Sequence, residues 1–255
     1  MATNNDRPAL ASRRSSTPSA EIIRSLPLSG RVVALTFDDG WCSKCVDKAL
    51  HVLLSSGAHA SICPNGAAGH ASWDKQASLV RLLVSRGQLS LCNHTFLHRD
   101  AVQSSKISLE EDVRRDGIWI MKEFRVSAKP YFRPPYGSFN ASTLEIAAGL
   151  GYPYVVLWSV DLGDASPGAP TADSEISRLV DGISPGAIVV AHLNRMVTAS
   201  SLPSVLTWLA TNKYRTVTLD ELFELSNEKT RSAGCGTTGK MRLRKMTTSG
   251  LCEHE

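Results

Sequence analysis

The hydrophobic pattern of the chain consists of short apolar runs that alternate with longer segments of helical periodicity. The first run, Val32 to Leu35, is β-branched and has no polar alternation, as is typical of a strand buried on both faces of a parallel sheet. It leads into Asp38, Asp39 and Gly40. Adjacent carboxylates at the end of a buried strand are costly unless a cation uses them. An Asp-Gly turn with Asp39 as a helix cap explains the same residues equally well.

The two patterns alternate from residue 31 to about residue 226. After the first strand, β-prone runs predict strands at 58–63, 88–92, 131–133, 154–160, 187–191 and 216–219. Apolar residues at helical spacing predict helices at 45–56, 73–86, 108–124, 141–150, 171–180 and 201–211. We expect Ser108 and Glu111 to form a capping box and Asp220 to cap a last helix. The alternation predicts an α/β fold with about seven parallel strands, near but short of a closed eight-stranded barrel.

The ends of the chain differ from the part between them. Residues 1–29 and 227–255 lack an apolar period, so we expect a disordered N-terminal segment, one domain at 30–226 and a disordered basic C-terminal tail. Of the net charge of +4, residues 1–30 carry +2 and residues 227–255 carry +3, which leaves −1 for the residues between. A core without a basic surplus argues against a nucleic-acid partner.

The location of the protein is less constrained. The sequence has no apolar run long enough to span a membrane and no apolar stretch of a signal peptide. We therefore expect a cytoplasmic monomer, or a secreted protein if an export signal is missing. The chain is too long for a disulfide framework to be implied by its six cysteines. We interpret Cys42 and Cys45 as small residues of a strand–helix loop rather than a metal or redox site, and the sequence does not decide whether Cys63 and Cys92 lie close together.

Two histidines follow the third strand. His94 and His98 are four residues apart, so both would lie on one face of a helical turn and could hold one ion together. Such a pair is often incidental, and a third ligand is needed. Asp39 is available at the equivalent end of another strand. Two imidazoles and one carboxylate suit a divalent ion with open positions, by default zinc, with iron, cobalt or nickel also compatible.

Two further strand ends carry polar residues. Arg133 precedes Pro134, Pro135 and Tyr136, and the two prolines fix the backbone there. A rigid loop with Arg133 on the surface is the simpler explanation. His192 follows the apolar run 188–191 and would emerge at the same rim. Taken alone, that position is better explained by a partly buried histidine bonded to a backbone carbonyl.

Taken together and in order, these strand ends resemble the polysaccharide deacetylase family, also called carbohydrate esterase family 4 or the NodB homology domain. The resemblance spans about residues 31–226. The matching motifs are Thr36–Gly40, His94–His98, Arg133–Tyr136 and Ile188–His192, with a weaker match at Trp158–Asp164. The resemblance implies a NodB-like distorted (β/α) barrel and metal-dependent hydrolysis of N-acetyl groups, usually on glucosamine units of chitin, chitooligosaccharide or peptidoglycan.

The resemblance also implies a role for each matching polar residue. The metal ligands would be Asp39, His94 and His98. Asp38 would be the general base, held in place by Arg133, and His192 would be the general acid. Asp164 would be the acidic partner of the fifth motif, and the backbone N–H of Tyr136 would donate to the oxyanion.

Three positions depart from the family pattern. Ala165 stands where the family usually has a tryptophan, Ile62-Cys63 replaces a common phenylalanine pair, and Leu193 replaces a frequent polar residue. Each change affects the shape of the substrate site rather than its chemistry, so we expect activity with unusual specificity. Two alternatives remain, a deacetylase of a small sugar-containing metabolite and a non-catalytic carbohydrate-binding module. Retention of the metal, base and acid residues argues against the second.

Overall fold

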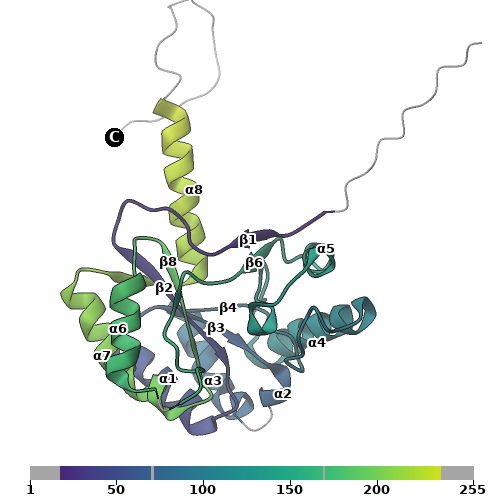
Figure 1. Ribbon diagram of the computed structural model, residues 1–255, viewed down its shortest axis with the longest axis horizontal. Coiled ribbons are helices and arrows are strands. Elements are labelled where there is room, and N and C mark those ends of the chain that lie inside the picture. The colour runs from purple at the N-terminus through teal and green to yellow at the C-terminus, as the bar shows by residue number, and fades with distance from the viewer. Residues whose placement is uncertain (1–17, 70–71, 169, 237–255) are drawn as a thin grey trace, which may run out of the picture.

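The computed structural model describes residues 18–69, 72–168 and 170–236, which form a parallel β structure wrapped by helices (Figure 1). The strands are β1 (Glu21–Ile23), β2 (Val32–Asp39), β3 (Ala60–Pro64), β4 (Leu89–Leu91), β5 (Tyr131–Phe132), β6 (Tyr154–Val156), β7 (Val160–Asp161), β8 (Ala187–His192) and β9 (Arg215–Val217). The helices are α1 (Ser43–Ser56), α2 (Gly66–Gly69), α3 (Trp73–Ser85), α4 (Lys106–Phe124), α5 (Ala141–Gly149), α6 (Ala172–Gly182), α7 (Met196–Thr211) and α8 (Leu219–Gly236), with a 3₁₀ turn at Pro135–Gly137. The predicted α/β alternation is confirmed.

Strand β2 lies at the centre, and all eight of its residues are buried. It pairs in parallel with β8 along most of its length. On its other edge it pairs with β9 at Val32–Ala34 and with β3 at Thr36–Asp39. Core side chains therefore cover both faces of β2, which explains why its sequence shows no polar alternation.

The strands form two sheets that together curve around the core. One has the order β4-β3-β2-β8-β7, and the other has the order β1-β6-β5. A bridge between Asn93 and Phe132 joins them on one side, and on the other the chain passes directly from β6 to β7. Every pairing between the named strands is parallel. This is the distorted (β/α) barrel that was predicted.

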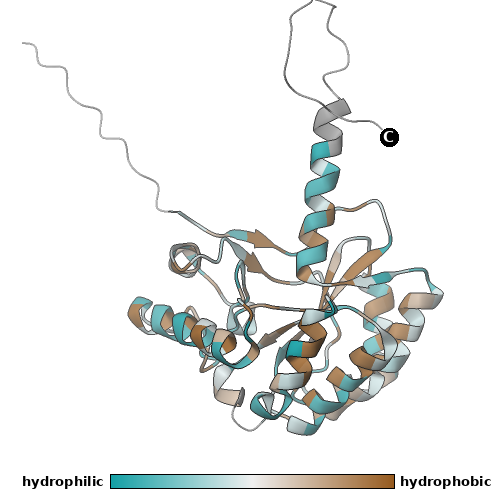
Figure 2. Cartoon of the chain, turned by 180° about the vertical axis from the view of Figure 1, so that it is seen from behind, coloured by the Kyte–Doolittle hydropathy of each residue, from teal (hydrophilic) through white to brown (hydrophobic). Residues whose placement is uncertain are grey.

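Both predicted domain boundaries are wrong for the described residues. Glu21–Ile23 form β1, which pairs with β6, and three residues are too few to show a period in the sequence. Helix α8 continues past residue 227 to Gly236 and projects from the barrel (Figure 1). Its length is largely hydrophilic (Figure 2). The predictions for residues 1–17 and 237–255 lie outside the described residues.

Two predicted helix caps are also wrong. The cap of helix α4 lies three residues before the predicted one, because Ser105 accepts a hydrogen bond from the backbone N–H of Ser108. Helix α8 is capped by Thr218 rather than by Asp220, because the Thr218 hydroxyl accepts from the Glu221 N–H while the Glu221 carboxylate accepts from the Thr218 N–H. Reciprocal bonds of this kind define a capping box.

Candidate active site

Asp38 and Asp39 end β2 at one mouth of the barrel, and both are buried. Asp39 has a left-handed backbone, with φ of 71°, and Gly40 follows with φ of 119°. A side chain at Gly40 would overlap the indole of Trp73, whose Nε1–H donates to the Asp39 carbonyl oxygen at 2.8 Å. Helix α1 is capped by Cys42 instead. The Asp-Gly pair is therefore a tight turn that directs two carboxylates into the site.

His94 and His98 lie on the loop that follows β4. The carboxylate of Asp116 accepts the His94 backbone N–H at 3.2 Å, and the side chain of Asn65 donates to the carbonyls of His94 and Thr95 at 2.7 and 3.0 Å. Thr95 and His98 have positive φ angles of 62° and 55°. The segment is thus a bent loop rather than the predicted helical turn. The bend brings the two imidazole centroids within 5.0 Å of each other.

Asp39, His94 and His98 form a cluster whose possible ligand atoms all lie within 4.8 Å of one another. Asp39 Oδ1 is 3.6 Å from His94 Nε2 and 3.2 Å from His98 Nε2. It is buried, and no hydrogen-bond donor from the described part of the chain reaches it. His94 Nδ1–H donates to the Arg133 carbonyl at 2.7 Å, which leaves its Nε2 lone pair facing the carboxylate.

The electrostatics of this cluster fit a cation. Burial lowers the pKa of His94 and of His98, so both imidazoles are neutral, as metal ligands must be. Burial and the adjacent Asp38 charge raise the pKa of Asp39 despite the opposing effect of His94. A buried, unpaired carboxylate oxygen that faces two neutral imidazoles is the donor set of a divalent metal site, and a bound cation would offset the desolvation of Asp39.

Asn194 holds the other oxygen of Asp39, and sequence reasoning missed it. Its Nδ2 donates to Asp39 Oδ2 at 2.6 Å, while its Oδ1 accepts from the backbone N–H groups of Gly40 and Trp41 at 3.3 and 3.0 Å. These bonds orient Asp39 so that Oδ1 points toward the histidines. The one signal in the sequence was the position of Asn194, two residues after His192.

Asp38 forms a buried ion pair with Arg133. Arg133 Nη1 donates to Asp38 Oδ1 at 2.7 Å and lies equally close to the hydroxyl oxygen of Thr36. The other guanidinium nitrogens donate to the carbonyls of Val156 and Leu157 at 2.9 and 3.3 Å. Burial alone would raise the pKa of Asp38, but the positive charge of Arg133, aided by His94 and His192, lowers it below its usual range. Asp38 is therefore a fixed anion at neutral pH.

His192 ends β8 and is bound to Asp164. Its Nδ1–H donates to Asp164 Oδ1 at 3.0 Å, and its backbone N–H donates to Asp164 Oδ2 at 2.7 Å. Burial lowers the pKa of His192, but the hydrogen bond to Asp164 and the charges of Asp38, Asp164 and Asp39 outweigh burial and raise the pKa to about 9. The imidazole is therefore protonated at neutral pH. The bond at Nδ1 leaves Nε2 as the nitrogen that can reach a substrate.

One open pocket of about 200 Å³ is lined by Asp38, Asp39, His94, His98 and His192, together with Asn194, Trp158 and Ala165. Tyr136 lies at its edge with φ of 61° and 69 % of its surface exposed, and its ring centroid is 4.7 Å from that of His98. Every polar residue predicted for the site lies in the pocket or contacts a residue that does. Ala165 lies on the pocket wall, at the position where the family pattern has a tryptophan.

Comparison with known proteins agrees with the family resemblance of the strand-end motifs. Residues 26–155, just over half of the chain, match the family model described as polysaccharide deacetylase. The chain belongs to the polysaccharide deacetylase family. The family and the hydrolase class predicted from the motifs are thereby confirmed, and the alternative of a non-catalytic carbohydrate-binding module is not supported.

Individual relatives of this family differ in their named substrates. A peptidoglycan-N-acetylglucosamine deacetylase of Bacillus cereus is 29 % identical over 82 % of this chain and 96 % of its own. A chitooligosaccharide deacetylase of Rhizobium leguminosarum is 31 % identical over 64 % of this chain and 71 % of its own.

Solved structures show the same fold. A family 4 carbohydrate esterase from Streptomyces lividans has a TM-score of 0.63 at 26 % identity and covers 74 % of this chain and 93 % of its own. A pseudoenzyme of the same family from Bacillus anthracis has a TM-score of 0.70 at 22 % identity, over 80 % of this chain and 69 % of its own, which indicates the fold alone.

The cysteines near the site are bonded in pairs, so Cys42 and Cys45 are more than the small loop residues that we interpreted them to be. Cys42 bonds to Cys45 at the start of α1, and Cys63 bonds to Cys92 across β3 and the end of β4. The second bond ties together the strand ends that precede Asn65 and His94.

Within the described residues, none of the helices combines the length and apolar character needed to cross a bilayer.

Proposed function

We propose that this protein is a metal-dependent deacetylase that hydrolyses the N-acetyl group of amino-sugar units in an oligomer or polymer of the chitin or peptidoglycan type. The observation that carries the proposal is the content of one pocket. It combines a metal-type donor cluster, a carboxylate with a lowered pKa and an imidazole with a raised pKa. The two relatives named for chitooligosaccharide and for peptidoglycan support the choice of substrate class.

Asp39, His94 and His98 would hold the metal. Zinc is the ion we expect by default, and cobalt, nickel or iron would fit the same donors. When bound, the ion supplies Lewis acidity toward the acetyl carbonyl and lowers the pKa of water.

Asp38 would act as the general base. Its lowered pKa keeps it anionic, and Arg133 fixes the carboxylate by binding Oδ1, which leaves Oδ2 to accept the proton of the attacking water. Oδ2 already lies 3.8 Å from His94 Nε2, so it faces the metal cluster. We assign the backbone N–H of Tyr136, a residue whose ring lies beside that of His98, to the oxyanion that develops on the acetyl carbonyl.

His192 would act as the general acid. An amine leaves poorly as an anion, so the nitrogen must gain a proton as the carbon–nitrogen bond breaks. Because the pKa of His192 is about 9, its Nε2 carries that proton at neutral pH. Asp164 would hold the ring through Nδ1 and stabilise the imidazolium, so that Nε2 faces the leaving amine.

The length of the substrate is the next question. The small side chain of Ala165 on the pocket wall suits an extended sugar chain, although a small N-acetylated sugar metabolite would also enter a pocket of this size. We also infer an oxidising location, such as the cell exterior, from the two disulfides, because cytosolic proteins rarely retain such bonds. This favours the second of the two locations that the sequence left open.

Acetate release tests the function directly. The full chain would be incubated with N-acetylated chitooligosaccharides of increasing length, with peptidoglycan, and with small N-acetylated amino-sugar metabolites, before and after chelation and after zinc is restored. We expect release from oligomers or polymer that chelation abolishes and zinc restores. Release from the small metabolites alone would assign the protein to metabolite deacetylation, and release from no substrate at any metal content would refute the proposal.

A further inference from the structure

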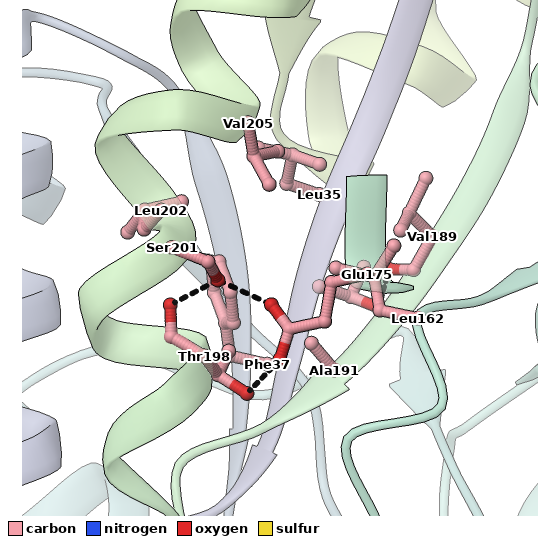
Figure 3. Close-up of a pocket in the computed structure, with 11 residues that line it drawn as sticks. Leu35, Phe37, Leu162, Glu175, Val189, Ala191, Thr198, Ser201, Leu202 and Val205 are labelled. Carbon is pink, nitrogen blue, oxygen red and sulfur yellow. Dashed lines mark hydrogen bonds between the residues drawn. The ribbon is translucent and has the colours of Figure 1, made fainter. Parts of the chain in front are cut away.

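A buried polar cluster lies behind the pair of His192 and Asp164. Helix α6 contributes Glu175, and helix α7 contributes Thr198 and Ser201 (Figure 3). All three residues are almost completely buried, and Glu175 has no exposed surface. They line a cavity of about 10 Å³ whose other walls are mainly apolar. A volume near 10 Å³ is at the lower limit for one water molecule, and the Glu175 carboxyl group has protein partners in Thr198 and Ser201.

The contacts run in one continuous chain from Glu175 to His192. Ser201 Oγ contacts Glu175 Oε2, and Thr198 Oγ1 lies 3.4 Å from Glu175 Oε1 (Figure 3). Thr198 Oγ1 also donates to Asp164 Oδ2 at 2.7 Å. Asp164 in turn accepts from both the ring and the backbone of His192. Thr198 therefore connects two carboxyl groups of which only Asp164 touches the imidazole.

The charge state of Glu175 decides the direction of these bonds. The described residues that line the cavity include no cation, and β2, β8 and α7 present only apolar and hydroxyl groups to it. The nearest acidic group is Asp164, and Arg178 of α6 packs against Gly163 but is exposed. Burial raises the pKa of Glu175, the Ser201 hydrogen bond opposes this, and the charge of Asp164 adds to it. A carboxyl group with no exposed surface and no cation among the described residues around it is expected to keep its proton, because its buried charge would be unpaired.

A neutral Glu175 gives each proton one acceptor. Thr198 has a single hydroxyl proton, and its shorter contact is to Asp164, so the proton lies there. In the longer contact, between Thr198 Oγ1 and Glu175 Oε1, the protonated carboxyl group of Glu175 is then the donor. Ser201 donates to Glu175 Oε2. Hydrogen bonds in such a chain polarise one another. The donor that reaches Asp164 is thus strengthened by a carboxylic acid behind it.

We propose that Glu175 is a positioning residue for the acid step, acting through Thr198 to stabilise the Asp164 carboxylate when His192 gives up its proton. The proposal rests on the function proposed above, in which His192 is the general acid. While His192 is protonated, the imidazolium neutralises Asp164. After proton transfer, the imidazole is neutral and the buried carboxylate depends on its remaining donors. A donor that matters more after transfer than before makes His192 a stronger acid.

This mechanism predicts the sign of the change when the relay is removed. Thr198→Val deletes the donor, so loss of the proton from His192 becomes harder and its pKa rises. Only part of the strength of this hydrogen bond differs between the two states of His192, so we expect its pKa to rise by about half a unit to one unit. Glu175→Leu should raise the pKa less, because Thr198 keeps its proton. Glu175→Gln donates through its amide and should restore the wild-type value.

The test measures the His192 pKa by NMR titration of ¹⁵N-labelled imidazoles in the zinc-loaded full chain, with His192→Ala to assign the signal. The alkaline limb of kcat against pH gives a second reading on the best substrate. We expect both to move to higher pH in Thr198→Val and Glu175→Leu, with kcat at neutral pH severalfold lower and KM unchanged, and to return in Glu175→Gln.

Leu202→Ala provides the control, because Leu202 lines the same cavity without a polar contact. It should lower the melting temperature without moving the His192 pKa. If the His192 pKa stays fixed or falls in Thr198→Val and Glu175→Leu, the proposal is overturned. Loss of packing alone would loosen the contact between Asp164 and His192 and so lower the His192 pKa. A Glu175→Gln variant that behaves like the leucine variant also overturns the proposal. The NMR titration needs no turnover, so it tests the relay even if no substrate releases acetate.

Discussion

Two ion pairs face the same pocket, and they are held in different ways. In the pair of Asp38 and Arg133, neither side chain exposes more than 3 % of its surface. In the pair of His192 and Asp164, the carboxylate is equally buried but the histidine side chain is 21 % exposed. The first pair has a cation that does not titrate in proteins, and the second has a cation that does.

This difference matches what a base and an acid need. A base that must be anionic at every working pH benefits from a permanent neighbouring charge, and Arg133 lowers the pKa of Asp38 after burial alone would have raised it. An acid must release its proton and recover it from solvent, so His192 keeps some exposure and a pKa of about 9. Activity should therefore extend from the low pKa of Asp38 up to about pH 9, where His192 loses its proton.

Removing the base should have the largest effect. Asp38→Asn keeps the shape of the side chain but cannot accept the water proton, so kcat should fall by roughly a hundredfold or more, the usual scale of general acid–base catalysis. Metal content should not change, because Asp38 is not assigned as a ligand. The measurements are kcat and elemental analysis on the same preparation. Near wild-type kcat with metal bound would exclude Asp38 as the base.

Removing the acid should cost slightly less. His192→Ala should lower kcat by about a hundredfold and abolish the alkaline limb of the pH profile, because the titrating proton donor is gone. Substrates whose leaving group needs less protonation should lose less activity. The comparison is kcat against pH for wild type and variant, and an alkaline limb that persists would have to come from another group.

Weakening the ion pair of Asp38 and Arg133 should have an intermediate effect on kcat. Arg133→Lys keeps the charge but loses the planar contacts to Thr36 and the carbonyls of Val156 and Leu157. The base should then be misplaced and its pKa less depressed, so kcat falls roughly tenfold and the acid limb moves to higher pH. Arg125→Lys, at the exposed end of α4, is the matched control. An unchanged acid limb in Arg133→Lys would mean that Arg133 does not set the pKa of Asp38.

The smallest effect should come from Asn194, which lines the same pocket. Asn194→Ala removes the donor to Asp39 Oδ2, so metal affinity should fall by about tenfold, at the low end of the usual effect of such partners. Excess zinc should restore most of kcat. Titration against a chromophoric chelator measures the affinity, and a variant that binds zinc as tightly as wild type would show that Asn194 does not orient Asp39.

The sequence predicted the strand ends better than the segments between them. Buried strands such as β2 and β8 are uniformly apolar, so the polar residues that follow them stand out, and Asp38, Asp39 and His192 could be named. Residues that neither directly follow a strand end nor fall in a matching motif could not be named. Asn194 matters only because it meets Asp39, 155 positions away. Glu175 reads as an ordinary polar residue of an amphipathic helix, and only the packing of α6 against α7 reveals that it is buried.

The backbone at the site was equally hidden from the pattern. Thr95 is β-branched and rarely adopts a positive φ, so the spacing of His94 and His98 predicted a helical turn. Tertiary bonds from Asn65 and Asp116 impose the bent loop instead. The ligand pair was predicted correctly, but from a local geometry that the structure does not have.

The two edges of β2 have a consequence for the order in which a nascent chain can assemble. Its neighbour β3 follows soon after it, but the bond from Thr36 to Val189 in β8 closes a loop of 153 residues. Contacts at such separation form slowly, and during synthesis they cannot form until the late segment leaves the ribosome. The metal cluster and the pair of Asp38 and Arg133 are encoded entirely in residues 38–133, before that segment. One edge of β2 stays unpaired until translation has passed β8. Through most of its synthesis the growing chain therefore exposes a strand edge that can pair with other chains.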